Sequence, residues 1–220
     1  CNESGGIIDD LIVYLVGRDE VRIIPNASNA STVAAALEAA APAGITIDNR
    51  HLEQGIIAVQ GPKSADVLKS LGLPTEHAYM AFEDAQWNGH ELTVCRTGYT
   101  GEHGYEIVIG NDGIVGLWNA ILEAGAPFGV LPCGLGSRDT LRTEMGYPLH
   151  GHELSLEITP VQAGSNWAVG WKKESFRGHE VLRKEREDGP RRILRGLQST
   201  DRGIPRAGME VKNSAGEVIG

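Results

Sequence analysis

The alternation of apolar and polar positions predicts strands and helices that follow one another along the chain. Apolar runs bounded by turn residues indicate strands over residues 5–16, 21–24, 55–60, 91–95 and 105–109. Apolar residues at helical spacing predict helices from Asn29 or Ser31 to Ala41, over Val67–Leu71, Asn111–Leu122 and Phe176–Asp188. The unit of strands followed by a helix occurs twice, so the pattern favours an α+β layer architecture.

The pattern of polar and apolar residues changes after Ser175. The polar helix ends at Asp188, Gly189-Pro190 follows, and short alternating pieces come next. We therefore place a domain boundary near Gly189, with a core over residues 1–188 and the start of a separate β-rich unit over residues 189–220.

Composition narrows the class of protein. The 220 residues are 41% hydrophobic and 22% charged, which is neither a disordered nor a membrane composition. No run reaches the ~18–20 apolar residues that a membrane span requires. The formal net charge of −9 disfavours a nucleic-acid partner. The widely spaced Cys1, Cys95 and Cys133 indicate reduced thiols in a reducing compartment. A start without Met and an end within an apolar run lead us to expect a fragment of a longer chain.

Asp9 and Asp10 are the first residues that suggest chemistry, because ionised and unpaired aspartates in an apolar strand are costly. Side chains alternate along a strand, so the two carboxylates are expected on opposite faces. Asp10 would then share a face with Tyr14, and the two could meet in one pocket. The alternative is that both aspartates lie in a turn before the strand and only cap it.

The segment from Arg96 to Ile107 has the glycine spacing G-x-x-G-x-x-G, but no helix follows it directly. It therefore lacks the context of a dinucleotide-binding loop, and we expect its glycines to let an aromatic-bearing turn approach something flat. Glu106 follows in an apolar strand. A carboxylate there requires a pair of donors, either a guanidinium in an internal salt bridge or the N–H edge of a heterocycle.

A helix with Ser137 as its N-cap places an arginine on an apolar stripe. Leu141, Met145 and Leu149 fall on this stripe, and Arg138 lies in its middle. A buried guanidinium must meet an anion or a carbonyl edge. Arg138 is therefore either one half of an internal ion pair with Glu106 or Asp10, or an arginine that holds a ligand. His150 and His152 lack a third ligand at metal-site spacing, so we expect no metal.

Five motifs occur in the order of one known family. They are Asn2 with Gly5–Leu11, Val59–Pro62, Thr97–Glu102, Gly134–Arg142, and Thr159-Pro160 with Trp167. On these motifs the chain resembles the T proteins of the glycine cleavage system, which are tetrahydrofolate-dependent aminomethyltransferases. The resemblance implies a folate-binding fold of mixed or antiparallel sheets with flanking helices, followed by the start of a C-terminal β-barrel. It also implies that the family's N-terminal segment and most of its barrel lie outside this sequence.

The resemblance also implies roles for particular residues. Asp10 matches the family's catalytic aspartate, and Tyr99 and Glu106 match the tyrosine and glutamate that hold the pterin. The further folate contacts that it implies are Tyr14, Asn26, Arg138 and Tyr147. It implies tetrahydrofolate as co-substrate, no metal, the lipoylated H protein as partner, and a cytoplasmic location, or a mitochondrial one in a eukaryote.

In the family, the substrate is an aminomethyl group carried on the lipoyl arm of the H protein. The reaction releases ammonia and leaves methylene-tetrahydrofolate. Two other classes share the fold, namely the folate-binding half of demethylating oxidases and iron–sulfur assembly factors. The latter carry a K-G-C-x-x-G-Q-E-like motif, whereas residues 175–180 here contain no cysteine. A module that binds folate without turnover is a further alternative.

Overall fold

The computed structural model describes all 220 residues, and its largest element is a four-stranded antiparallel sheet of order β3-β6-β5-β4. The strands are β3 (Gln54–Gln60), β4 (Phe82–Trp87), β5 (His90–Cys95) and β6 (Gly104–Gly110). A separate two-stranded hairpin consists of β1 (Ile12–Leu15) and β2 (Val21–Ile24). The sheets are therefore antiparallel throughout.

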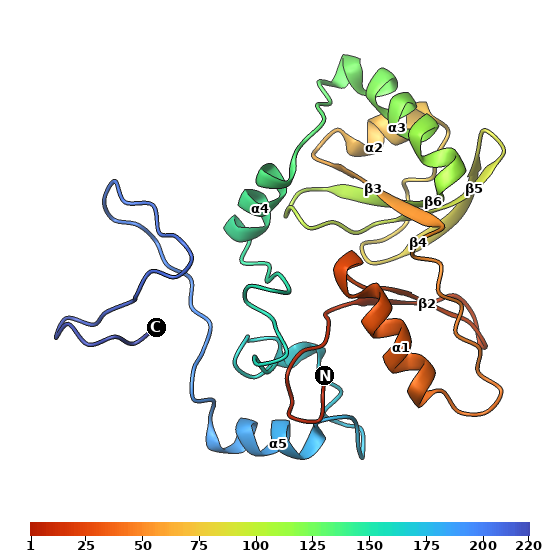
Figure 1. The fold of residues 1–220 in the computed structure, drawn as a ribbon. Helices are drawn as coiled ribbons and strands as arrows, with labels where there is room; N and C mark the ends of the chain where they lie inside the picture. Colours follow the sequence, from red (N-terminus) through yellow and green to blue (C-terminus); the bar gives the residue numbers. More distant parts are fainter.

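Helices α2 (Ser64–Ser70) and α3 (Asn111–Gly125) lie on one side of the large sheet, and the hairpin lies on the other (Figure 1). The other α-helices are α1 (Ala30–Ala40), α4 (Leu135–Glu144) and α5 (His179–Asp188). Helices α2 and α3 pack on β3 and β6, whereas α1 accompanies the hairpin. None of the helices has the length and apolar character to cross a bilayer.

The main core lies between the sheet and helices α2 and α3. Its buried members are Ile57, Val59, Val67, Leu68, Leu73, Leu92, Val94, Tyr105, Ile107, Ile109, Leu117 and Ile121. Because side chains alternate along a strand, the residues between these positions point to the opposite face of the sheet. This second face carries Ile56 and Ala58 of β3, Thr93 and Cys95 of β5, and Glu106 and Val108 of β6.

The hairpin covers the part of the second face that β4 and β5 form. The Tyr14 ring packs against Phe82 with centroids 5.0 Å apart, and Arg22 forms an ion pair with Asp84. The part formed by β3 and β6 is less covered, because Ile56 is 47% exposed. The hairpin therefore covers the second face at β4 and β5 and leaves it open at β3 and β6.

Three differences from the sequence-based expectations concern the elements themselves. Strand β4 was not expected, because its exposed and half-buried residues lack apolar alternation, as is typical of a sheet edge. The first strand begins at Ile12, so the preceding residues are irregular and the expected strand over residues 5–16 is too long. Helix α5 begins at His179, not at Phe176, because Gly178 before it has a left-handed backbone (φ 80°).

Residues 189–220 contain no strand. Their only regular feature is an isolated bridge between Lys212 and Val218. Arg192 and Leu194 are hydrogen-bonded to Glu157 and Gln162, and the residues after them extend away from the remainder of the chain (Figure 1). The structure therefore contains no C-terminal barrel.

Candidate functional site

Asp10 lies at the open end of the hairpin, opposite Asn26. The register pairs Ile12 with Ile24, and two further residues along this register place Asp10 across from Asn26. The Asn26 Nδ2 group donates a hydrogen bond of 2.9 Å to Asp10 Oδ1, and the second carboxylate oxygen has no partner within the protein. Burial raises the pKa of Asp10, the bond from Asn26 opposes this, and the charge of Asp9 adds to it.

Asp9 is instead fully engaged by the protein. Its carboxylate accepts the backbone N–H of Asn26 at 2.9 Å and the side-chain amides of Asn26 and Asn29 at 2.7 and 2.9 Å. The expectation that the two aspartates point to opposite faces was wrong, because both precede β1 and converge on Asn26. Asp9 links the segment before β1 to Asn26 and Asn29, whereas Asp10 keeps one carboxylate oxygen without a hydrogen-bond partner.

Glu106 lies on the second face of the sheet, where Ala58 and Cys95 are its cross-strand neighbours. Thr97 Oγ1 donates to Glu106 Oε2 at 2.6 Å and accepts the Tyr14 hydroxyl at 3.4 Å. Burial raises the pKa of Tyr14, so its phenol remains a neutral donor. No cationic side chain pairs with Glu106, so the expected internal salt bridge is not formed.

The glycines at 98 and 104 make room for the side chain of Gln60. A Cβ atom at either position would overlap its amide group. In this space Gln60 Nε2 donates to the backbone carbonyls of Thr97 and Tyr105 at 3.2 and 3.0 Å. These two glycines therefore allow an internal amide to fix the segment around Thr97, which differs from the expectation that they let an aromatic-bearing turn approach something flat.

Tyr99, Tyr147 and Arg138 form a stack of flat groups beside this segment. The two tyrosine rings are 5.7 Å apart with an interplanar angle of 24°, and the Arg138 guanidinium lies 4.5 Å from the Tyr99 centroid. The Tyr99 hydroxyl donates to the backbone carbonyl of Pro148. Burial raises the pKa of Tyr99; the charge of Arg142 opposes this shift, and the charge of Asp10 adds to it.

Arg142, one turn after Arg138, is the buried arginine of α4. It is 5% exposed, and it donates to Asp139 at 2.8 Å, to Glu153 at 2.7 Å and to the carbonyl of Tyr147 at 3.2 Å. Arg138 is exposed and has no ion-pair partner. The alternative of a buried Arg138 paired with Glu106 or Asp10 was therefore wrong, because the acceptors after the helix, Glu153 and the Tyr147 carbonyl, lie at Arg142.

The structure thus brings the expected residues together in three neighbouring groups. One contains Asp10 and Asn26, the second Tyr14 and Glu106, and the third Tyr99, Arg138 and Tyr147. Thr97, which joins the second group through its hydroxyl, was not singled out by the sequence analysis. The signal that could have drawn attention to it is its place at the start of the Thr97–Glu102 motif, two residues after β5.

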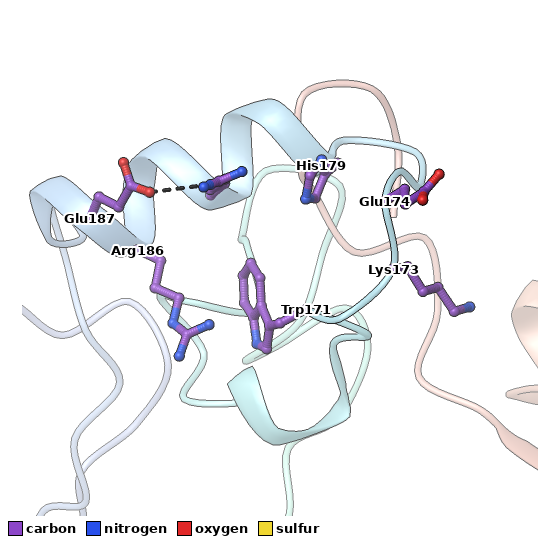
Figure 2. A pocket seen from close by; sticks show the side chains of 7 residues that line it. Trp171, Lys173, Glu174, His179, Arg186 and Glu187 are labelled. Atoms are coloured by element: carbon purple, nitrogen blue, oxygen red, sulfur yellow. Dashed lines mark hydrogen bonds and ion pairs between the residues drawn. The ribbon is translucent and has the colours of Figure 1, made fainter.

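A separate hollow lies beside α5, away from the sheet (Figure 2). It is lined by Trp171, Lys173, Glu174, His179, Arg183, Arg186 and Glu187. The Arg186 guanidinium stacks on the Trp171 ring at 4.7 Å, and Arg183 pairs with Glu187 at 3.2 Å. None of the residues expected in the functional site lines this hollow.

Comparison with known protein families matches residues 1–173 to the GCVT N-terminal domain, and the chain belongs to this family. It is 55% identical to the aminomethyltransferase of Mycobacterium avium (strain 104) over 96% of the chain, and 54% identical to that of Frankia alni over all of it. These matches cover 58% and 60% of the two relatives. The chain therefore spans about 60% of the length of the curated relatives that it matches.

A solved structure agrees with the sequence matches. The crystal structure of glycine cleavage system aminomethyltransferase T from Bartonella henselae superposes with a TM-score of 0.87 at 33% sequence identity. The superposition covers 99% of this chain and 59% of that one. This chain therefore shares its fold with a member of the family that its sequence motifs resemble.

Proposed function

We propose that this chain is the folate-binding part of a tetrahydrofolate-dependent aminomethyltransferase of the glycine cleavage system, in the bacterial cytoplasm. The observation that carries the proposal is the Glu106 carboxylate on the open part of the sheet, with one donor, Thr97, and no cation. The relatives named as aminomethyltransferases support it, because they match the chain over nearly its whole length.

The surface around Glu106 suits the pterin ring of a folate. One carboxylate oxygen has no partner within the protein, and a pterin edge presents adjacent N–H donors. Ile56 and Val108 provide apolar area on the same face of the sheet. We propose that Glu106 holds the ring edge, and that Tyr99 and Tyr147 contribute aromatic faces to the same ligand.

Arg138 and Tyr14 contribute to this site from different elements. The Arg138 guanidinium is unpaired and stacks on Tyr99, so its donors remain free for an anionic or carbonyl group of the ligand. The Tyr14 hydroxyl donates to the Thr97 hydroxyl, and this bond orients the Thr97 hydroxyl toward the Glu106 carboxylate. We propose that Arg138 and Glu106 line one pocket without contacting each other.

Asp10 is the residue that we propose to be catalytic. Tetrahydrofolate supplies the amine nitrogen that receives the one-carbon unit. The free oxygen of Asp10 can accept a hydrogen bond from that amine, and its charge stabilises the positive charge that develops there. Asn26 fixes the orientation of the carboxylate by its bond to the other oxygen.

We further propose that the one-carbon unit is an aminomethyl group presented on the lipoyl arm of the H protein. Transfer of its methylene carbon to tetrahydrofolate forms methylene-tetrahydrofolate, releases the nitrogen as ammonia and leaves the lipoyl arm as dihydrolipoyl. The solved structure with the same fold carries the name of the glycine cleavage system, which supports this partner. No step in this proposal is assigned to a metal ion.

Residues 189–220 are proposed to begin a second, barrel-forming unit after the core of residues 1–188. The Val211 N–H donates to the Gly220 carbonyl at 2.7 Å, and Lys212 and Val218 form a bridge. This pairing has the form of a small hairpin. Ile204 and Leu197 are 70% and 68% exposed, so the unit has apolar side chains that a barrel would bury.

An activity assay tests the proposed function directly. The complete gene product is incubated with tetrahydrofolate and the lipoylated H protein carrying the aminomethyl group. We expect release of ammonia and an equal amount of methylene-tetrahydrofolate. One-carbon transfer only from an N-methyl amine in the presence of a flavin would instead indicate a demethylating oxidase. Folate binding without any turnover would indicate a binding module.

A further inference from the structure

The β1–β2 hairpin is attached to the four-stranded sheet by side chains alone. No ladder and no other backbone hydrogen bond joins the two. Tyr14 and Arg22 are direct cross-strand partners, so their side chains leave the hairpin on the same face and reach the sheet together. The position of the hairpin therefore depends on what these two residues contact.

Arg22 makes the most directional of these contacts. Its Nη1 and Nη2 groups donate to the two carboxylate oxygens of Asp84 at 2.6 and 3.1 Å, and Nη1 also donates to Thr93 Oγ1 at 3.0 Å. The Thr93 hydroxyl in turn donates to Asp84 at 2.6 Å, so β4 and β5 hold the acceptor together. The guanidinium lies 5.7 Å from the Phe82 centroid, the same ring on which Tyr14 packs.

The ends of this hairpin carry the proposed catalytic groups. Asp10 precedes β1, Asn26 follows β2, and Tyr14 in the middle reaches Glu106 through Thr97. Glu106 belongs to the sheet. A rotation of the hairpin on the sheet would therefore change the distance between Asp10 and Glu106 without breaking any hydrogen bond of either unit.

Because the Arg22–Asp84 ion pair is partly exposed, its effect on the orientation of the hairpin can be distinguished from its effect on the stability of the fold. The Arg22 and Asp84 side chains are 35% and 52% exposed, and pairs at this exposure contribute little to the free energy of unfolding. A bidentate guanidinium–carboxylate contact nevertheless fixes the relative orientation of the two elements. Loss of the pair is thus expected to loosen the hairpin more than it destabilises the fold.

We propose that Arg22 is a positioning residue of the aminomethyl-transfer site. With Asp84 and Thr93 it clamps the β1–β2 hairpin onto the sheet, and so holds Asp10 at its working distance from Glu106. The catalytic part of this inference rests on the proposed function, whereas the clamp itself is a property of the fold.

The test compares Arg22→Met with Arg18→Met in the complete gene product. Arg18 is an exposed arginine of the same hairpin without an ion-pair partner, so it is a matched control. For Arg22→Met we expect several-fold faster deuterium exchange of the hairpin amides. We also expect a kcat about ten- to hundred-fold lower and a nearly unchanged melting temperature. Arg18→Met is expected to change none of these.

Two further variants test the contact between Arg22 and Asp84, one by changing the acceptor and one by changing the shape of the donor. Asp84→Asn keeps one acceptor oxygen but removes the negative charge and the bidentate contact. It should reproduce the effects of Arg22→Met, and the double variant should be no worse than either single one. Arg22→Lys keeps the charge but loses the bidentate contact, so an intermediate kcat is expected. If Arg22→Met fails to fold, these two variants decide the question.

The outcomes separate the clamp from the proposed function. Unchanged hairpin exchange in Arg22→Met and Asp84→Asn would overturn the clamp. Faster exchange with unchanged kcat would overturn the positioning role. If the wild-type protein neither binds tetrahydrofolate nor turns over, the proposed function fails and the positioning role fails with it. Hairpin exchange then still decides the clamp.

Discussion

Asp9 and Asp10 show how two adjacent aspartates acquire different roles. Asp9 accepts three hydrogen bonds from Asn26 and Asn29, whereas Asp10 accepts one on its side chain and keeps a free oxygen. The difference arises from the chain before β1, which brings both carboxylates to Asn26. At the scale of single residues, the proposed function depends on this free oxygen.

Asp10→Asn in the complete gene product should remove most turnover and leave tetrahydrofolate affinity within a few-fold. The asparagine still accepts the bond from Asn26 but lacks the negative charge, and loss of such a group costs about a hundred-fold or more in rate. Steady-state kinetics and a binding titration measure the two effects. Asp9→Asn should mainly lower stability, and a larger loss of kcat in Asp9→Asn would reverse the assignment of the two residues.

The raised pKa of Asp10 predicts a pH-dependent stability difference. The folded protein holds the Asp10 proton more tightly than the unfolded chain, so this residue makes stability fall as pH rises from about 4 through its folded pKa. Asp10→Asn removes this loss. Its melting temperature should exceed that of the wild type at pH 7 and equal it at pH 3, by calorimetry. A lower melting temperature at pH 7 would contradict the account.

The position of Asp10 could be predicted in part from the sequence. Strands over residues 5–16 and 21–24 were expected, and in the structure their pairing register places Asp10 opposite Asn26. The pair of aspartates was assigned to the strand because the apolar run continues through Ile7 and Ile8. The strand begins later because Ile7 N–H bonds to the carbonyls of Ser155 and Ile158, far away in the sequence.

At the scale of elements, α4 carries one exposed arginine, Arg138, and one buried arginine, Arg142. Arg138 and Arg142 are one turn apart and lie on the same side of the helix. Which of them is buried depends on Glu153 and Tyr147, both outside the helix. The apolar stripe drawn through Leu149 could not show this, because α4 ends at Glu144.

This difference predicts opposite effects for two matched substitutions. Arg142→Met removes the guanidinium from the half-buried Glu153, which keeps only the Leu149 N–H as donor, so it should lower the free energy of unfolding by about 3 kcal/mol. Arg138→Met should change it by less than about 0.5 kcal/mol and weaken tetrahydrofolate binding. Urea denaturation and a binding titration measure these effects. The assignment fails if Arg138→Met is the more destabilising of the two.

At the scale of the whole molecule, buried and exposed apolar residues are unevenly distributed. The sheet and its two helices share one large core, whereas residues beyond α3 contribute only a small cluster around Leu154. The α+β class followed from the alternation of strand and helix patterns. The half-open second face did not, because the sequence does not reveal that the hairpin covers only β4 and β5.

The exposed apolar residues predict self-association of the 220-residue chain. Leu131 and Leu135 are 76% and 84% exposed near α4, and Leu197 and Ile204 are exposed in the last segment. Apolar groups displayed in this way favour association or aggregation. Sedimentation velocity should show species larger than a monomer at micromolar concentration. A single monomeric species with a cooperative melt would disprove this expectation.

The central claim is that Glu106 holds a folate by its free carboxylate oxygen, and one titration tests it most directly. Tetrahydrofolate is titrated by calorimetry into the complete gene product, into Glu106→Gln and into Glu91→Gln. Glu91 is an exposed carboxylate on the neighbouring strand β5 without an ion-pair partner and serves as the control. Glu106→Gln should weaken binding by about 1.5–3 kcal/mol, roughly ten- to hundred-fold in Kd, and Glu91→Gln should bind like the wild type. Equal affinity of the wild type and Glu106→Gln would contradict the account.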